Sequence, residues 1–279
     1  MSARGLAKPS APEEIWAFFI ASKERNVPKL ITRGPKGRLN RYSVRDIVRV
    51  VGEPPMGLSQ GWRMLRIESS APIQVAEGPK SAKGQMVTYA GVTQHLHYTN
   101  ENQREELDTH SRGEFEPSND TTAVLIPIGK SAQWWRLAQD VKQTYFKKTE
   151  TYEGHTAIGL KYVDRVYRKL YHSKYTGPSL PYDFLTYFEF QSIHEDDFKL
   201  LLAELRDTER NPEWAFVGLE YEIWMTKLGP DGHMLDPVSR TPKGGEGDRD
   251  RKESRDDHRR DDDQGIAQQN RVRVRRSGV

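Results

Sequence analysis

The stretch Thr149–Phe190 reads TETYEGHTAIGLKYVDRVYRKLYHSKYTGPSLPYDFLTYFEF. Within it, VYRKLYHS (166–173) and the run ending in FLTYFEF (184–190) alternate with the period of two that β-strands have. The sequence Gly-Pro-Ser-Leu-Pro at 177–181 favours a turn between these runs. We therefore predict two neighbouring antiparallel strands here.

The strand period predicts which side chains share one face of this strand pair. They are Arg168, Leu170, His172, Phe184, Thr186, Phe188 and Phe190. Such a face combines a guanidinium, a hydroxyl and several aromatic rings. A cationic donor in an apolar wall suits a small anion bound beside a flat hydrophobic cofactor.

The flanking segments predict helices on either side of the strand pair. A buried apolar strand at 121–128 precedes a helix at 132–149. After the strand pair, the segment 196–210 predicts a helix whose core stripe consists of Phe198, Leu201, Leu202 and Leu205. The segment 214–228 predicts a closing strand, which we place at a sheet edge.

The N-terminal part has weaker signals. The apolar run within 13–25 is compatible with a strand or a helix. Residues 26–40 predict a loop, and 43–51 predict a short helix capped by Ser43. The segments 61–69 and 85–98 predict strands.

Three ordered runs carry a resemblance to a known family: LIPIGKSAQWW (125–135), GHTAIGLKYVDRVYRKLYHS (154–173) and DFLTYFEF (183–190). Together they resemble the haem-binding half of the chlorite dismutase family, over about 91–211. The resemblance implies an α+β fold, a dimeric α+β barrel of two ferredoxin-like halves, with haem in the C-terminal half.

This resemblance and the composition together predict four regions. Residues 1–12 form a disordered leader, and 13–90 form a shortened N-terminal ferredoxin-like half. Residues 91–228 form the haem-binding ferredoxin-like half. Residues 229–279 form a charged disordered tail, because they lack the apolar periodicity that could bury a core.

By the same resemblance, His155 is the axial ligand of a haem b iron. Glu209 is the carboxylate partner of that imidazole, and Lys130 joins it. Arg168, thirteen residues after His155, is the distal cation. Taken singly, each residue has an ordinary reading as a polar or ion-paired surface group, and only the ordered pattern favours these roles.

The resemblance also implies further contacts to the haem. Trp134 and Trp135 lie beside it, Thr186 and Phe188 line the distal cavity, and Tyr98 is near the propionates. The two tryptophans could equally be core aromatics.

The implied activity is that of a chlorite dismutase (chlorite O2-lyase), an oxidoreductase that converts chlorite to chloride and dioxygen. Oxygen-atom transfer to ferric iron would leave a hypochlorite intermediate, which Arg168 would hold by charge-assisted hydrogen bonds. The substrate is chlorite or a related small anionic oxidant. Alternatives are a coproporphyrin-haem decarboxylase, a peroxidase-like relative or a non-enzymatic haem-binding protein. Ile126 stands where the decarboxylase branch has a tyrosine, which argues against the first.

The composition of the chain limits the kinds of partner that it is expected to bind. The net charge of +3 comes from residues 240–279, which hold 12 Lys and Arg against 9 Asp and Glu, so the remaining chain is balanced and no nucleic-acid partner is expected. The chain has no cysteine, which excludes disulfides and thiolate ligands. We see no secretion signal and no apolar run of membrane-spanning length, so we expect no membrane partner and a cytoplasmic location. The resemblance implies a homo-oligomer, a dimer or a pentamer.

Overall fold

A computed structural model of the chain describes residues 14–23, 31–33, 38–55, 58–75, 86–93, 113–174, 176, 180–231 and 233. The predicted leader, most of the predicted tail and Tyr98 lie outside these residues. No helix in the described part of the chain is both long enough and apolar enough to cross a bilayer.

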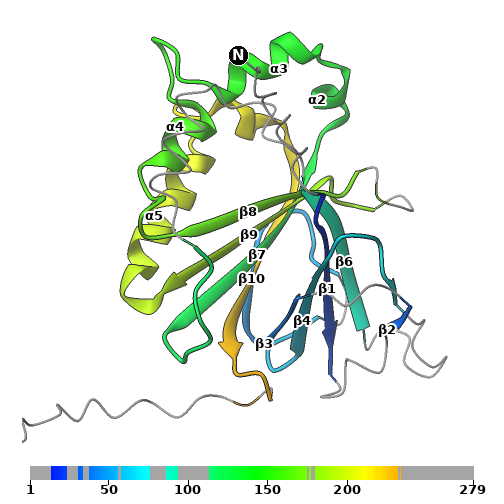
Figure 1. Cartoon of the computed structure of the whole chain (residues 1–279). Coiled ribbons are helices and arrows are strands. Elements are labelled where there is room, and N and C mark those ends of the chain that lie inside the picture. The colour runs from blue at the N-terminus through cyan, green and yellow to red at the C-terminus, as the bar shows by residue number, and fades with distance from the viewer. Residues whose placement is uncertain are drawn as a thin grey trace, which may run out of the picture. The chain divides into compact units, whose positions relative to one another are not determined.

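Eight antiparallel strands close into a barrel in the order β1-β4-β3-β10-β7-β9-β8-β6 (Figure 1). Their bounds are β1 Trp16–Ser22, β3 Arg38–Val51, β4 Arg63–Ser69, β6 Met86–Thr93, β7 Thr121–Lys130, β8 Tyr167–His172, β9 Phe184–Gln191 and β10 Val217–Leu228. Two short strands, β2 (Ile31–Arg33) and β5 (Gln74–Val75), pair separately.

The barrel consists of two halves with the same strand order. The N-terminal half runs β6-β1-β4-β3 and the C-terminal half runs β10-β7-β9-β8, so each half has the order fourth, first, third, second. The pairs β3–β10 and β6–β8 join the halves. This arrangement confirms the predicted α+β barrel of two related halves. The predicted boundary at residue 90 falls inside β6, which the strand order assigns to the N-terminal half.

Helices accompany the C-terminal half. Between its first and second strands come α2 (Ala132–Arg136), α3 (Gln139–Phe146) and α4 (Gly154–Leu160), and α5 (Glu195–Arg206) connects the third strand to the fourth. This is the βαββαβ order of a ferredoxin-like unit. The described residues of the N-terminal half form strands without helices.

Two N-terminal predictions were wrong. The segment 43–51 is part of β3 rather than a capped helix, because β3 pairs with β4 on one side and β10 on the other. That pairing outweighs a local capping signal. The segment 26–40 is not wholly a loop, since it contains β2 and the start of β3. Within the ambiguous run at 13–25, Trp16–Ser22 forms β1.

Three C-terminal boundaries also differ from the prediction. The helix predicted at 132–149 is two helices, since Leu137 and Ala138 are extended. The helix predicted to reach residue 210 ends at Arg206. The closing strand is not at an edge, because β10 lies between β3 and β7 in the closed barrel, and Trp214 precedes it in a short 3-10 helix, Pro212–Phe216.

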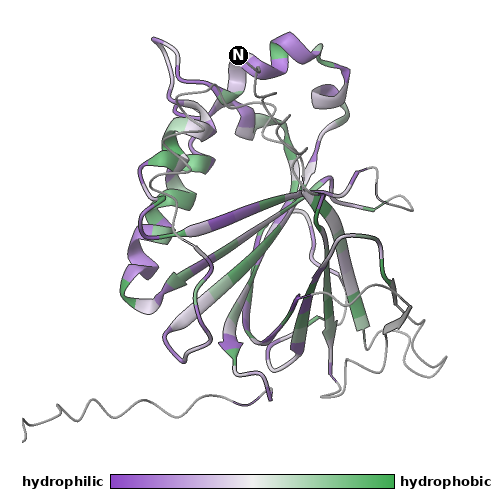
Figure 2. Ribbon diagram, viewed as in Figure 1, coloured by the Kyte–Doolittle hydropathy of each residue, from purple (hydrophilic) through white to green (hydrophobic). Residues whose placement is uncertain are grey.

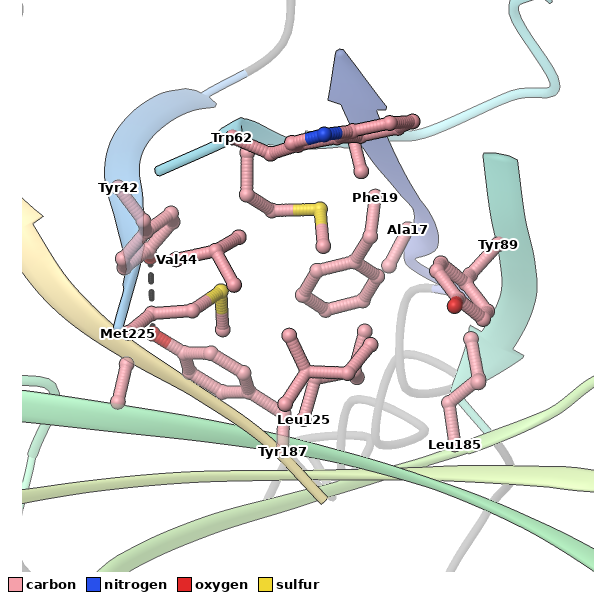
Figure 3. Packing of buried hydrophobic residues seen from close by; sticks show 14 of the residues in the cluster. Ala17, Phe19, Tyr42, Val44, Trp62, Tyr89, Leu125, Leu185, Tyr187 and Met225 are labelled. Carbon is pink, nitrogen blue, oxygen red and sulfur yellow. Dashed lines mark hydrogen bonds between the residues drawn. The ribbon is translucent and has the colours of Figure 1, made fainter. Parts of the chain in front are cut away.

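Two apolar cores fix this arrangement. Figure 3 shows the barrel interior, where the rings of Phe19 and Tyr42 pack against Tyr187. The second core lies between the helices and the outer face of the sheet, and it includes the predicted stripe of α5: Phe198, Leu201, Leu202 and Leu205. Hydropathy on the ribbon shows the corresponding hydrophobic stretches in α5, while β8 is hydrophilic in its middle (Figure 2). The functional cavity opens beside this second core.

A buried polar network runs through the barrel interior. Arg66 and Lys227 have side chains that are 0% and 1% exposed, and Lys227 Nζ lies 2.8 Å from Glu189. Arg66 lies 2.7 Å from Glu68, whose pKa burial would raise, but Arg66 and Lys169 lower it to about 2. These buried charges are therefore matched by opposite charges, which is the condition for tolerating them in a core.

Candidate functional site

A cavity of about 400 Å³ lies between the helices and the outer face of the C-terminal strands. Of the nine residues predicted for the site, seven line it: Lys130, Trp134, Trp135, His155, Arg168, Thr186 and Phe188. Tyr98 lies outside the described residues, and Glu209 does not line the cavity. The volume is within the usual range for a cavity that holds a small molecule or cofactor.

The start of α4 positions His155. Gly154 has φ +70, and its N–H and that of Glu153 donate to the Arg210 carbonyl. A Cβ at position 154 would lie 2.9 Å from the Phe146 carbonyl oxygen, so glycine satisfies both the dihedral angle and the close approach. The chain can thus begin a helix at the cavity wall with His155 as its second residue.

One nitrogen of the His155 ring is held by a carboxylate. Nδ1 lies 2.5 Å from Glu213 Oε2, and Lys130 Nζ lies 2.8 Å from Glu213 Oε1. Burial would raise the pKa of Glu213, but Lys130 and His155 lower it to about 2, so the carboxylate is ionised at neutral pH. It accepts a hydrogen bond from Nδ1–H, which leaves Nε2 as the nitrogen available to a metal.

Glu213 occupies the place that the sequence prediction gave to Glu209, which was wrong. Glu209 is exposed in the turn after α5, where its N–H donates to Asp207 Oδ1. Because α5 ends at Arg206, the chain turns before entering the short helix that contains Glu213. The sequence signal for this second carboxylate was Asn-Pro-Glu, since proline favours the first turn of a helix.

The predicted strand face is present in the cavity wall. The pocket-side residues of β8 are Arg168, Leu170 and His172, and those of β9 are Phe184, Thr186 and Phe188. The Arg168 side chain is exposed, and a guanidinium stays cationic at neutral pH. A Cβ on Gly159 of α4 would be 3.4 Å from Arg168 Nη1, so this guanidinium reaches from the sheet towards α4.

The two tryptophans have different surroundings. Trp134 is 2% exposed, and its ring packs against Phe146 and Phe216 with Lys130 Nζ 4.9 Å from the ring centre. Trp135 faces the sheet, where its ring stacks on Phe184 at 6.0 Å. Both line the cavity, and Trp134 is at the same time a core aromatic.

The cavity also contains residues that were not predicted as site residues. Burial lowers the pKa of His172 to about 4, so its imidazole is neutral at pH 7. Glu220 is 2% exposed and accepts from Arg206, and burial raises the pKa of Glu220 to about 7 although Arg206 opposes this. The strand period placed His172 on this face without assigning it a role, whereas Arg206 and Glu220 come together only through tertiary packing.

Comparisons with known proteins agree with this geometry. No family model matches the chain. It is 29% identical over 127 residues to a chlorite dismutase of Ideonella dechloratans, a match that spans 45% of this chain and 41% of that relative. A dimeric chlorite dismutase of Nitrobacter winogradskyi is similar in structure, with 27% identity, a TM-score of 0.52, and coverage of 75% of this chain and 99% of the other.

A mutant chlorite dismutase of Candidatus Nitrospira defluvii shares the fold, with 18% identity, a TM-score of 0.52, and coverage of 78% of this chain and 92% of that one. The partial sequence match and the fold shared over nearly the whole Nitrobacter protein point to the same relatives. The chain is therefore similar to chlorite dismutases in its fold and, over 127 aligned residues, in its sequence.

Proposed function

We propose that this chain is a haem b enzyme that converts chlorite to chloride and dioxygen. The observation that carries the proposal is the His155–Glu213–Lys130 chain in the same cavity as Arg168. An imidazole with one nitrogen held and the other available suits an iron ligand, and a guanidinium in the same space suits an anionic substrate. The family supports the same reaction.

The residues of the cavity fit a haem. Its walls include Ile126, Phe188 and Trp134, which suit a flat apolar ring, and Nε2 of His155 forms no hydrogen bond with the described residues. We propose that His155 holds the iron and that the two indoles pack against the porphyrin. Haem bound there supplies a ferric iron that can exchange an oxygen atom with chlorite.

Glu213 and Lys130 act on the electron density and the orientation of the His155 imidazole. Because Glu213 is ionised and accepts a hydrogen bond from Nδ1–H, it makes His155 a more electron-rich ligand and fixes its ring orientation. Lys130, whose side chain is 7% exposed, keeps the carboxylate in place with a 2.8 Å contact.

Arg168 acts on the anions. The fixed positive charge of Arg168 attracts chlorite into the cavity. Its planar donors can hold hypochlorite by charge-assisted hydrogen bonds until the hypochlorite oxygen has combined with the oxygen atom that chlorite gave up.

Ile126 distinguishes this proposal from a coproporphyrin-haem decarboxylase. It is 2% exposed and lines the cavity next to Thr186 on the neighbouring strand. An aliphatic side chain there offers neither a phenolic proton nor a site for a radical. The solved Nitrobacter relative is dimeric, and we propose that this chain also forms a dimer.

The test of the proposal is oxygen evolution from chlorite by the haem-loaded protein, measured with an oxygen electrode. Arg168→Ala should retain haem but lose turnover by roughly 10- to 100-fold, the value of a hydrogen bond to a charged group, and should bleach sooner. Arg136→Ala is the matched control, since Arg136 is exposed outside the cavity. Wild-type turnover and lifetime in Arg168→Ala would refute the role of this residue.

A second prediction separates the two candidate carboxylates. Glu213→Gln should weaken haem binding or activity by roughly 10- to 100-fold, as loss of a partner to a ligating histidine does, and should shift the reduction potential of the iron upwards. Glu209→Gln should change neither, because Glu209 is exposed. Spectroelectrochemical titration of both variants checks this, and equal potentials would contradict the assignment.

A further inference from the structure

The helix that carries His155 is too short to be stable by itself. α4 has 7 residues, and the side chain of its N-cap residue, Glu153, makes no capping hydrogen bond. A helix of this length is marginal without tertiary contacts. α4 lies beside α5 (Figure 1), and Ile158 of α4 is buried in the same apolar core as Leu201 of α5. The contacts between these two helices therefore decide where His155 points.

Four charged side chains form a closed ring across α4 and α5. Arg210 Nη2 lies 2.6 Å from Glu153 Oε1, and Arg210 Nη1 lies 2.9 Å from Glu204 Oε1. Lys161 Nζ lies 2.5 Å from Glu153 Oε2 and 3.2 Å from Glu204 Oε2. Each cation thus contacts both carboxylates. A single exposed ion pair stabilises a protein very little, but several charges in one network can contribute measurably.

This four-charge ring holds α4 at both of its ends. Glu153 is the residue before the helix begins, Lys161 is the residue after it ends, and Glu204 is on α5. Arg210 belongs to the turn after α5, and its backbone carbonyl also accepts hydrogen bonds from the N–H groups of Glu153 and Gly154. The ring therefore joins both ends of α4 to α5 and to the turn that follows α5.

We propose that Arg210 is a positioning residue for His155. Arg210 does not line the cavity, so it acts through the residues that it holds. Its guanidinium closes the ring that fixes α4, and it begins the segment 210–213, which ends at the carboxylate of Glu213, 2.5 Å from His155 Nδ1. The imidazole and its carboxylate are thereby fixed relative to each other. This inference rests on the proposed function, because it takes His155 to be the ligand of the iron.

The first test is Arg210→Gln, which removes the charge and keeps the backbone carbonyl. Haem dissociation into an excess of a haem-scavenging protein should become faster by roughly 2- to 30-fold, as expected from the loss of two partly exposed ion pairs. The reduction potential of the iron should shift upwards, because Glu213 then holds the imidazole less firmly. Arg210→Lys should reverse part of both changes, since an ammonium keeps the charge but not the planar fork of donors.

Salt provides a second readout that is specific to charge. The four side chains of the ring are between 11% and 38% exposed, so dissolved ions should screen them in part. Raising sodium chloride from roughly 0.05 M to roughly 1 M should speed haem dissociation from the wild-type protein more than from Arg210→Gln.

Arg165→Gln is the matched control. Arg165 is 32% exposed and lies 2.8 Å from Asp197 of α5, so it joins the same part of the chain to α5 without contacting a carboxylate of the ring. The dissociation rate, the reduction potential and the salt dependence of this variant should equal those of the wild-type protein.

Amide hydrogen exchange of the haem-free, full-length protein tests the ring without the cofactor. Exchange within α4 should be faster in Arg210→Gln by roughly 2- to 30-fold and unchanged in Arg165→Gln. Failure of the folded wild-type protein to bind haem would overturn both the proposed function and this inference. If haem binds, a wild-type dissociation rate and potential in Arg210→Gln, unchanged exchange within α4, or no recovery in Arg210→Lys would overturn only the inference.

Discussion

Replacing His155 with alanine is expected to abolish oxygen evolution from chlorite and to weaken haem binding by roughly 100-fold or more, since loss of even an outer-shell partner costs 10- to 100-fold. The reason is geometric. His155 is the imidazole whose Nδ1 is held by Glu213, and its ring is placed at the cavity wall by Gly154. The measurement is haem titration at the Soret band, followed by oxygen-electrode assays.

Chemical rescue makes this prediction specific. Imidazole added to the His155→Ala protein should restore part of the Soret spectrum, because the ring it replaces is only partly buried, at 25% exposure. His194→Ala is the control histidine, since His194 pairs with Asp197 and does not line the cavity. An alanine variant with unchanged haem affinity and spectrum would contradict ligation by His155.

Replacing Lys227 with methionine is expected to lower the free energy of unfolding by about 3–5 kcal/mol, the cost of breaking a buried ion pair by removing one partner. Lys227 Nζ lies 2.8 Å from Glu189 Oε1 and 2.9 Å from Glu114 Oε1, and it donates to the Phe115 carbonyl. Methionine fills similar space but leaves Glu189 without its cation, and burial already raises the pKa of Glu189. Urea unfolding monitored by tryptophan fluorescence measures the change.

A double variant tests the mechanism of that loss. Lys227→Met combined with Glu189→Gln should be less destabilised than the sum of the two single variants, because the second change removes the unpaired charge. Lys199→Met is the surface control, since Lys199 pairs with Glu195 in solvent and its loss should leave the unfolding midpoint unchanged. Additive single effects would show that the pair is not coupled.

Some residues of the site could be predicted from the sequence, and others could not. The strand period placed Arg168 and His172 on one face, and both line the cavity. It could not choose between Glu209 and Glu213, because the five-residue turn 207–211 decides which carboxylate reaches His155. Glu220 gave no signal of its own, since its significance depends on Arg206 from a different element.

The sequence by itself determined features that depend on neighbouring residues. The two-residue period of β8 and β9 and the apolar stripe of α5 follow from backbone geometry, which repeats regardless of what the segment contacts. Only the tertiary structure decided that 43–51 is a strand of a closed barrel and that Glu213 holds His155. Both outcomes depend on contacts between residues that are distant in the sequence. The free energy of such contacts outweighs the helix and strand propensities of single residues, which differ by only about 1 kcal/mol.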